Sequence, residues 1–140
     1  MPTWIIFALF SAIFAALVAI LGKIGISGVD TTLATAIRAI VMAVFLVLVA
    51  VFFGKFNHLG SFNNKAIIFI ILSGIAGALS WLFYFFALKN GPASGVVSID
   101  RLSVIFVLIF AIIFLGEKLT LKSLFGAIFV VFGAILMSIK

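Results

Sequence analysis

The sequence contains no cysteine, only two prolines and only three acidic residues. The lack of cysteine excludes a disulfide framework, a thiolate zinc site and an iron–sulfur cluster. Only 9% of the 140 residues are charged, whereas a soluble domain needs roughly a quarter of its residues charged to cover its surface. Instead, 67% of the residues are hydrophobic, and the mean hydropathy is +1.57. Because water cannot be the main solvent of such a chain, we expect an integral membrane protein.

Basic residues outnumber acidic ones, nine against three, which gives a formal net charge of +6. They stand singly between apolar blocks and do not form the basic run that nucleic-acid binding favours. We therefore expect them to flank membrane spans, and we predict no nucleic-acid partner.

Five apolar stretches are long enough to cross a hydrocarbon core of about 30 Å as helices. Because the apolar runs are continuous, they lack the alternation of barrel strands. The connections are short, and the third contains a tight turn at Asn90-Gly91-Pro92. The sequence thus predicts an all-α integral membrane protein, a bundle of five transmembrane helices in one domain over 3–140. The helices are expected at about 4–22, 32–53, 66–88, 95–115 and 121–139.

The basic residues are shared almost evenly between the two sides of such a bundle. The side with the N-terminus receives four lysines, and the opposite side receives three lysines together with Arg38 and Arg101. The positive-inside rule then gives almost no preference for one orientation. Two interpretations stay open: the chain inserts in both directions and pairs head to tail, or another factor fixes a single orientation.

Three ionisable residues lie at lipid depth, Arg38 in the second span and Asp100 with Arg101 in the fourth. Such groups are costly unless they are paired or hydrated. Both spans start from the same side, so an ion pair between Arg38 and Asp100 is geometrically allowed. One interpretation is a cavity in which an arginine meets an anion and Asp100 meets a cation or proton. The other is an internal salt bridge, with Lys23 and Arg101 extending to the interface.

Small and hydroxylated residues follow one face of the third span, with Trp81 beside them. The stripe suits close helix packing, and it also suits the lining of a water-filled path. Trp81 and Tyr84 are suited to stack on an organic substrate or to anchor the helix at the membrane interface. We expect two similar stripes, in the first and fifth spans, to be helix–helix seams. The three stripes are Ser73, Gly77, Ser80 and Tyr84; Ser11, Ala15, Ala19 and Gly22; and Gly126 with Gly133.

Motifs of known enzymes are missing from the sequence, including the nucleophile elbow, the phosphate-binding glycine loop and paired carboxylates at helical spacing. His58 stands alone in a polar connection, where we expect a surface residue. Glu117 precedes Lys118 at a span end, where we expect a solvated carboxylate. We therefore predict no catalytic residue, no metal and no cofactor.

Several short segments carry a resemblance to a known family. They contain the Gly-Pro-Ala-Ser turn, the Asp-Arg-Leu-Ser segment and the Gly-Glu-Lys-Leu-Thr helix end, together with an arginine-bearing second helix. The chain resembles, over its full length, an EamA domain of the drug/metabolite transporter superfamily. Most members hold two such domains in ten helices, inserted in opposite directions, and this chain is similar to the short bacterial and archaeal branch with one. Because Ser103 stands where many members have proline, the resemblance gives no ground to expect their kink in the fourth helix. The segments are Leu33–Arg38, Ala87–Ser94, Ile99–Val104, Leu115–Thr120 and Gly126–Ala127.

The resemblance implies a multi-pass protein of the plasma or inner membrane that transports a small metabolite or drug, with the substrate near a domain interface. Together with the balanced charges, it favours an antiparallel homodimer that rebuilds the ten-helix fold and works by alternating access. The open alternatives are a non-transporting membrane subunit that pairs with a different chain, and a channel or enzyme role. The candidate residues for substrate or ion binding or gating are Arg38, Asp100, Tyr84, Trp81, Arg101, Lys23 and Ser80.

Overall fold

The computed structural model describes residues 2–139, and of His58, Leu59 and Ser61 it describes the backbone alone. This range is helical and contains no strand. Five stretches are long and apolar enough to cross a membrane, namely α1, α2, α3, the pair α4 and α5, and α6. The predicted fold class is confirmed. The elements are α1 (Thr3–Gly25), α2 (Thr31–Phe52), the 3₁₀ helix η1 (Lys55–Ser61), α3 (Asn64–Asn90), α4 (Ala93–Asp100), α5 (Ser103–Leu115) and α6 (Leu121–Ser138).

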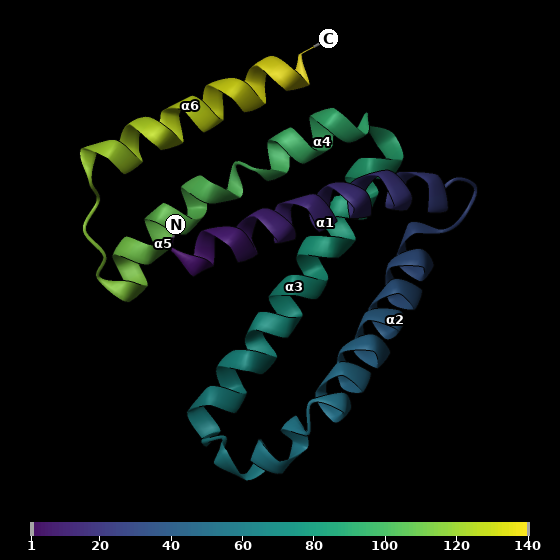
Figure 1. Cartoon of the computed structure of the whole chain (residues 1–140). Helices are drawn as coiled ribbons and strands as arrows, with labels where there is room; N and C mark the ends of the chain where they lie inside the picture. The colour runs from purple at the N-terminus through teal and green to yellow at the C-terminus, as the bar shows by residue number, and fades with distance from the viewer. Residues whose placement is uncertain (1, 140) are drawn as a thin grey trace. The chain divides into compact units, whose positions relative to one another are not determined.

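The chain divides into two compact units, which we describe separately. The first contains α1 up to Leu21 together with α4, α5 and α6, and the second runs from Gly22 to Lys89. In the second unit, α2 and α3 run in opposite directions and η1 joins them (Figure 1). The η1 helix lies in a connection that the sequence pattern predicted only as a loop.

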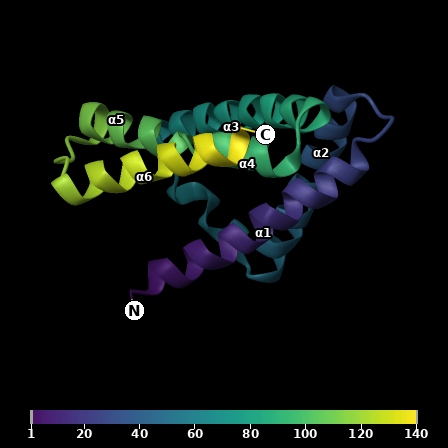
Figure 2. The ribbon, with the colours of Figure 1, turned by 90° about the horizontal axis from the view of Figure 1, so that it is seen from above.

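In the first unit, α4 and α6 lie side by side in both ribbon views (Figures 1 and 2). Small residues of α4 permit this approach, because Gly95 and Ser98 are both buried. A Cβ atom on Gly95 would lie 3.9 Å from the Cα atom of Ser138 on α6. The Ser98 hydroxyl donates to the carbonyl oxygen of Ser94, 2.7 Å away, so its burial leaves no hydrogen bond unmade.

The seam predicted at Gly126 and Gly133 is not where α6 packs. A Cβ atom at either glycine would meet nothing within 4 Å. The buried residues of α6 are instead Ala127 and Ala134, one position further along the helix. A spacing of seven residues fits both pairs, so the period alone did not fix which pair faces a neighbour.

The fourth span is broken where the sequence predicted one helix over 95–115. Its two parts, α4 and α5, are separated by a turn at Arg101 and Leu102. The N–H groups of Leu102, Val104 and Ile105 bond to the carbonyl oxygen three residues earlier, at 2.9–3.1 Å. This spacing is that of a 3₁₀ turn, which is tighter than an α-helix. The span therefore changes its helical geometry just after Asp100.

The packed core of the second unit lies where α3 ends and the connection before α2 begins. Ile26, Thr31, Phe85 and Leu88 are all at most 3% exposed. Gly22 completes this contact, because a Cβ atom there would lie 3.2 Å from the ring of Phe85. Of the stripe predicted in the first span, Gly22 makes such a contact, whereas Ser11 is exposed.

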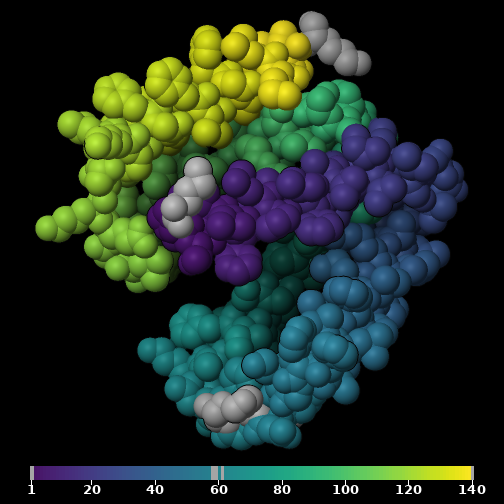
Figure 3. Space-filling model, viewed as in Figure 1, coloured from purple at the N-terminus to yellow at the C-terminus, as the bar shows by residue number. Residues whose placement is uncertain are grey.

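Large apolar side chains cover most of the helix surfaces. Phe7 of α1, Phe114 of α5 and Phe129 of α6 are each more than 70% exposed. Figure 3 shows the side chains of α6 standing out along the helix. Exposed apolar surface of this extent is unfavourable in water and favourable in a lipid bilayer.

Candidate functional site

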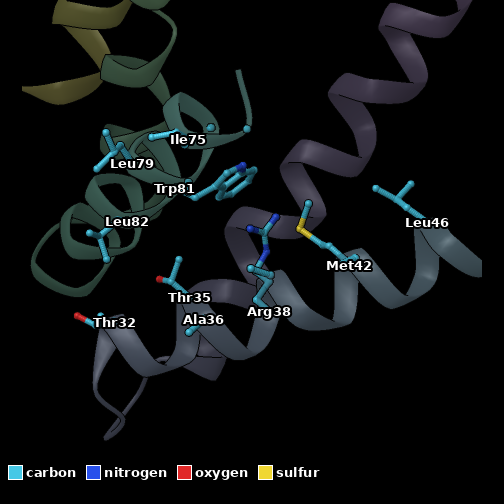
Figure 4. Close-up of a pocket in the computed structure, with 15 residues that line it drawn as sticks. Thr32, Thr35, Ala36, Arg38, Met42, Leu46, Ile75, Leu79, Trp81 and Leu82 are labelled. Atoms are coloured by element: carbon cyan, nitrogen blue, oxygen red, sulfur yellow. The ribbon is translucent and has the colours of Figure 1, made fainter. Parts of the chain in front are cut away.

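A groove of about 760 Å³ lies between α2 and α3 (Figure 4). Its walls are almost entirely apolar, and Arg38 is the one charged residue among those that line it. Arg38 stands about two turns into α2, roughly 10 Å along the helix axis. The lining residues are Thr32, Thr35, Ala36, Arg38, Ala39, Met42, Ala43 and Leu46 of α2, and Gly74, Ile75, Gly77, Ala78, Leu79, Trp81 and Leu82 of α3.

Arg38 crosses the groove to an aromatic cluster on α3. Its guanidinium carbon lies 3.6 Å from the centre of the Trp81 ring and 5.5 Å from that of Phe85. Figure 4 shows the guanidinium of Arg38 beside the indole of Trp81. Tyr84 meets the Trp81 ring edge to face, with the ring centroids 5.4 Å apart. A cation over an indole face gains about 2 kcal/mol or more where water is excluded, so this contact holds the arginine in place.

No carboxylate balances the charge of Arg38 within residues 22–89. Asp30 is the one acidic residue of that unit, and its side chain accepts a hydrogen bond from the N–H of Leu33 at 2.9 Å. Asp30 is thus used as the N-cap of α2. Within its unit, Arg38 is stabilised by aromatic faces in place of a counter-ion.

The polar groups at one end of the groove are already satisfied. The Thr35 hydroxyl donates to the carbonyl oxygen of Thr31, 2.7 Å away, and both residues are buried. Such a bond to the preceding turn is how a hydroxyl is accommodated in an apolar helix. Thr35 therefore needs no polar partner from the groove, whereas Arg38 is its one charged lining residue.

Lys23 makes contacts that have a structural purpose. Its ammonium group donates to the carbonyl oxygens of Leu88 and Lys89 at the end of α3. Lys89 in turn donates to the carbonyl oxygen of Val29, 3.3 Å away. A cation at a helix C-terminus satisfies free carbonyls and is favoured by the helix dipole. These bonds join the 22–30 segment to α3, and Lys23 is not among the residues that line the groove.

The other predicted site residues lie outside the groove lining. Ser80 is exposed on α3, and Tyr84 is half-buried behind Trp81. Asp100 and Arg101 belong to the first unit, where both are exposed at the end of α4. The pair of Arg38 with Asp100 joins residues of the two units and stays a prediction. The side chain of His58 lies outside the described residues.

The sequence pattern missed Phe85, Met42 and Thr35. Phe85 is one of eighteen phenylalanines in a uniformly apolar chain, so its residue type carried no signal. Its spacing did carry one, because residues four apart share a helix face and Phe85 follows Trp81 at that distance. For Thr35 the signal was weaker, since it follows the two threonines at the start of α2, Thr31 and Thr32.

Comparison with known proteins places this chain in a family. The EamA-like transporter family matches residues 2–139. A Sinorhizobium protein described as "Uncharacterized transporter in cobO 3'region" is 38% identical over 137 residues, which cover 98% of this chain and 97% of the relative. An uncharacterized protein of Methanocaldococcus jannaschii is 28% identical over 101 residues, which cover 72% of this chain and 74% of the relative. No solved structure matches the chain.

Proposed function

Since the chain belongs to the EamA-like transporter family and is a multi-pass transporter of the cell membrane, we propose that it moves a small metabolite or drug by alternating access, as an antiparallel homodimer. The observation that carries this proposal is the groove between α2 and α3. It lies along two membrane-spanning helices and contains a single arginine held over aromatic rings. The proposal assigns transport to the protein and no catalytic step.

The size and lining of the groove suit a small organic solute. A volume of about 760 Å³ falls within the range of about 300–1,000 Å³ typical of small-molecule sites. Such sites are mostly apolar and carry few polar groups, which fix the orientation of the ligand. Arg38 and the Trp81 ring supply those fixed groups, and residues such as Met42 and Leu79 supply the apolar wall.

The open side of the groove supports a partner of the same kind. Gly74 and Gly77 line the groove, and a Cβ atom on either would meet nothing within 4 Å. A second copy is suited to cover this side, since five helices and their inverted copy form the ten-helix arrangement of inverted-repeat transporters. The nearly even distribution of basic residues supports opposite insertion of the two copies.

Transport itself is tested with purified protein in liposomes. We expect counterflow of at least one solute in a panel of labelled amino acids, organic acids and quaternary ammonium cations, above the flux of protein-free liposomes. The expected size of the signal is about tenfold over that background, which corresponds to a barrier to exchange lowered by about 1.4 kcal/mol. If every solute stays at background while a different chain co-purifies from native membranes, the protein is a non-transporting subunit instead.

Opposite insertion is tested with reporters at the C-terminus, one active only in the cytoplasm and one active only outside. We expect comparable signals from both, within about threefold, because the charge bias between the two sides is nearly zero. As a control, two lysines added in the 55–61 connection are expected to shift the ratio strongly toward one reporter. A signal from only one side in the unmodified chain would contradict the antiparallel homodimer.

A further inference from the structure

We propose that the groove between α2 and α3 selects solutes with one carboxylate and an apolar body, and that the edge of the Arg38 guanidinium binds the carboxylate. This inference rests on the proposed transport function and names the substrate class of the same site. It follows from how Arg38 is held, what it lacks and what surrounds it.

The stacking of Arg38 leaves its hydrogen-bond donors available. The guanidinium carbon of Arg38 lies over the Trp81 ring, 3.6 Å from its centre, which is van der Waals contact distance. The N–H donors of a guanidinium lie in its plane and point away from a stacked ring. Arg38 forms no hydrogen bond with the described residues of 22–89, so the donors at its edge have no acceptor within that unit. A carboxylate fits such an edge with two parallel hydrogen bonds.

The charge of the groove determines the charge of the ligand that it favours. Arg38 is its one charged lining residue, and Asp30, the acidic residue of the same unit, is bound at the start of α2. A cation without a counter-ion in its own unit is unfavourable at this depth, and a carboxylate relieves that cost by supplying a negative charge. A cationic solute is repelled by the same group. With a single cation present, the groove matches one negative charge and does not match a polyanion.

The walls of the groove determine what kind of body the ligand carries beside its carboxylate. Beyond Arg38 the lining consists of apolar side chains such as Met42, Leu46, Ile75 and Leu79. Burying an apolar body against them is favourable at about 25 cal/mol per Å². The structure therefore favours a solute that is apolar at one end and carries its carboxylate at the other.

Trp81 is a built-in reporter for this site, because the chain has only one other tryptophan, Trp4. In a Trp4→Phe background in dodecyl maltoside, Trp81 emission is titrated with three solutes of the same size: 3-phenylpropionate, its amide and 3-phenylpropylamine. We expect a saturable change with the acid. We expect the amide and the amine to bind roughly tenfold to hundredfold more weakly, as fits the loss of a charge-assisted hydrogen bond.

The same titration of variants assigns the effect to Arg38. Arg38→Gln is expected to weaken phenylpropionate binding roughly tenfold to hundredfold, and Arg38→Lys to weaken it less, because lysine keeps the charge and loses the planar fork. Lys118→Gln removes an exposed charge between α5 and α6 and is expected to leave binding unchanged. Size-exclusion profiles and far-UV circular dichroism of each variant show whether it is folded.

Three results of the binding titrations overturn the inference. The first is equal affinity for the acid, the amide and the amine. The second is unchanged binding of the acid to folded Arg38→Gln protein. The third is that, in nanodiscs, phosphatidylglycerol changes Trp81 emission and the acid no longer does. The last would assign the anion to a lipid headgroup instead of a solute. Counterflow of amines that survives Arg38→Gln would leave the transport function standing and refute the carboxylate. If the acid binds but no solute shows counterflow, the carboxylate site stands and the transport function is refuted.

Discussion

Replacing Trp81 with alanine is expected to lower solute counterflow roughly tenfold to thirtyfold. The indole face lies 3.6 Å from the guanidinium carbon of Arg38 and is the closest aromatic ring to it. A half-buried contact of this kind contributes about 1–2 kcal/mol, and each 1.4 kcal/mol corresponds to about a tenfold change. Without the ring, Arg38 loses the surface that fixes its orientation in the groove. The measurement is the initial rate of counterflow in liposomes, with the best solute of the panel.

A graded series separates this role from a general effect on folding. Trp81→Phe keeps an aromatic face with a weaker quadrupole, and we expect it to retain an intermediate rate. Trp4→Ala is the matched control, because Trp4 is 67% exposed near the start of α1, and we expect its rate within about twofold of the unmodified protein. If Trp81→Leu transports as well as Trp81→Phe, the ring serves only to fill space, and the role assigned to the Arg38 contact is wrong.

The helices were largely predictable from the sequence because lipid imposes a simple requirement. A span must be apolar over its full length and must satisfy its own backbone, so long apolar runs between polar breaks locate it. Arg38 was predictable for the same reason, since a charge inside such a run is rarely without a partner or a purpose. The partner was harder to predict. The sequence indicated Trp81 only as a residue suited to stack on a substrate or to anchor the helix, because a helix pattern does not say which neighbouring helix a side chain meets.

The break in the fourth span had no clear signal in its residue types. The segment from Asp100 to Ser103 contains no glycine or proline, the residues that usually interrupt a helix. The structure nevertheless changes to 3₁₀ bonding there, so that the N–H groups of Leu102 and Val104 bond three residues back. Two charged residues at the break, Asp100 and Arg101, are both exposed. Hydropathy alone averages over such a feature, which is why one continuous helix was expected.

The sequence pattern also could not predict which face of α6 is buried. Glycines and alanines both permit close contact, and Gly126 with Gly133 has the same spacing as Ala127 with Ala134. Ala127 and Ala134 are buried, whereas a Cβ atom on either glycine would meet nothing within 4 Å. The residues of α4 that allow α6 to approach are small, since Gly95 and Ser98 are both buried and Gly95 lies close to Ser138. Substitution at the glycine of α4 therefore has the largest effect on stability that we expect.

Gly95→Leu is expected to lower the free energy of unfolding by about 1–3 kcal/mol, the usual cost of overpacking a close contact. A Cβ atom at this position would lie 3.3 Å from the ring of Pro92 and 3.9 Å from the Cα atom of Ser138, so a larger side chain has no room without moving α6. Gly95→Ala is expected to be nearly neutral, because the tight contact with Pro92 is offset by a gain in helix propensity of about 1 kcal/mol. The measurement is unfolding in mixed micelles with increasing dodecyl sulfate, followed by far-UV circular dichroism.

Gly126→Leu supplies the matched control on the facing helix. It makes the same chemical change at a glycine whose Cβ would meet nothing within 4 Å, and we expect no loss of stability there, with a gain of up to about 1 kcal/mol from helix propensity. Equal losses for Gly95→Leu and Gly126→Leu would show that leucine is harmful at either place and that α4 and α6 do not pack closely at Gly95. A loss confined to Gly95→Leu, with Gly95→Ala retained, locates the contact between the two helices at the one position where α4 has no side chain.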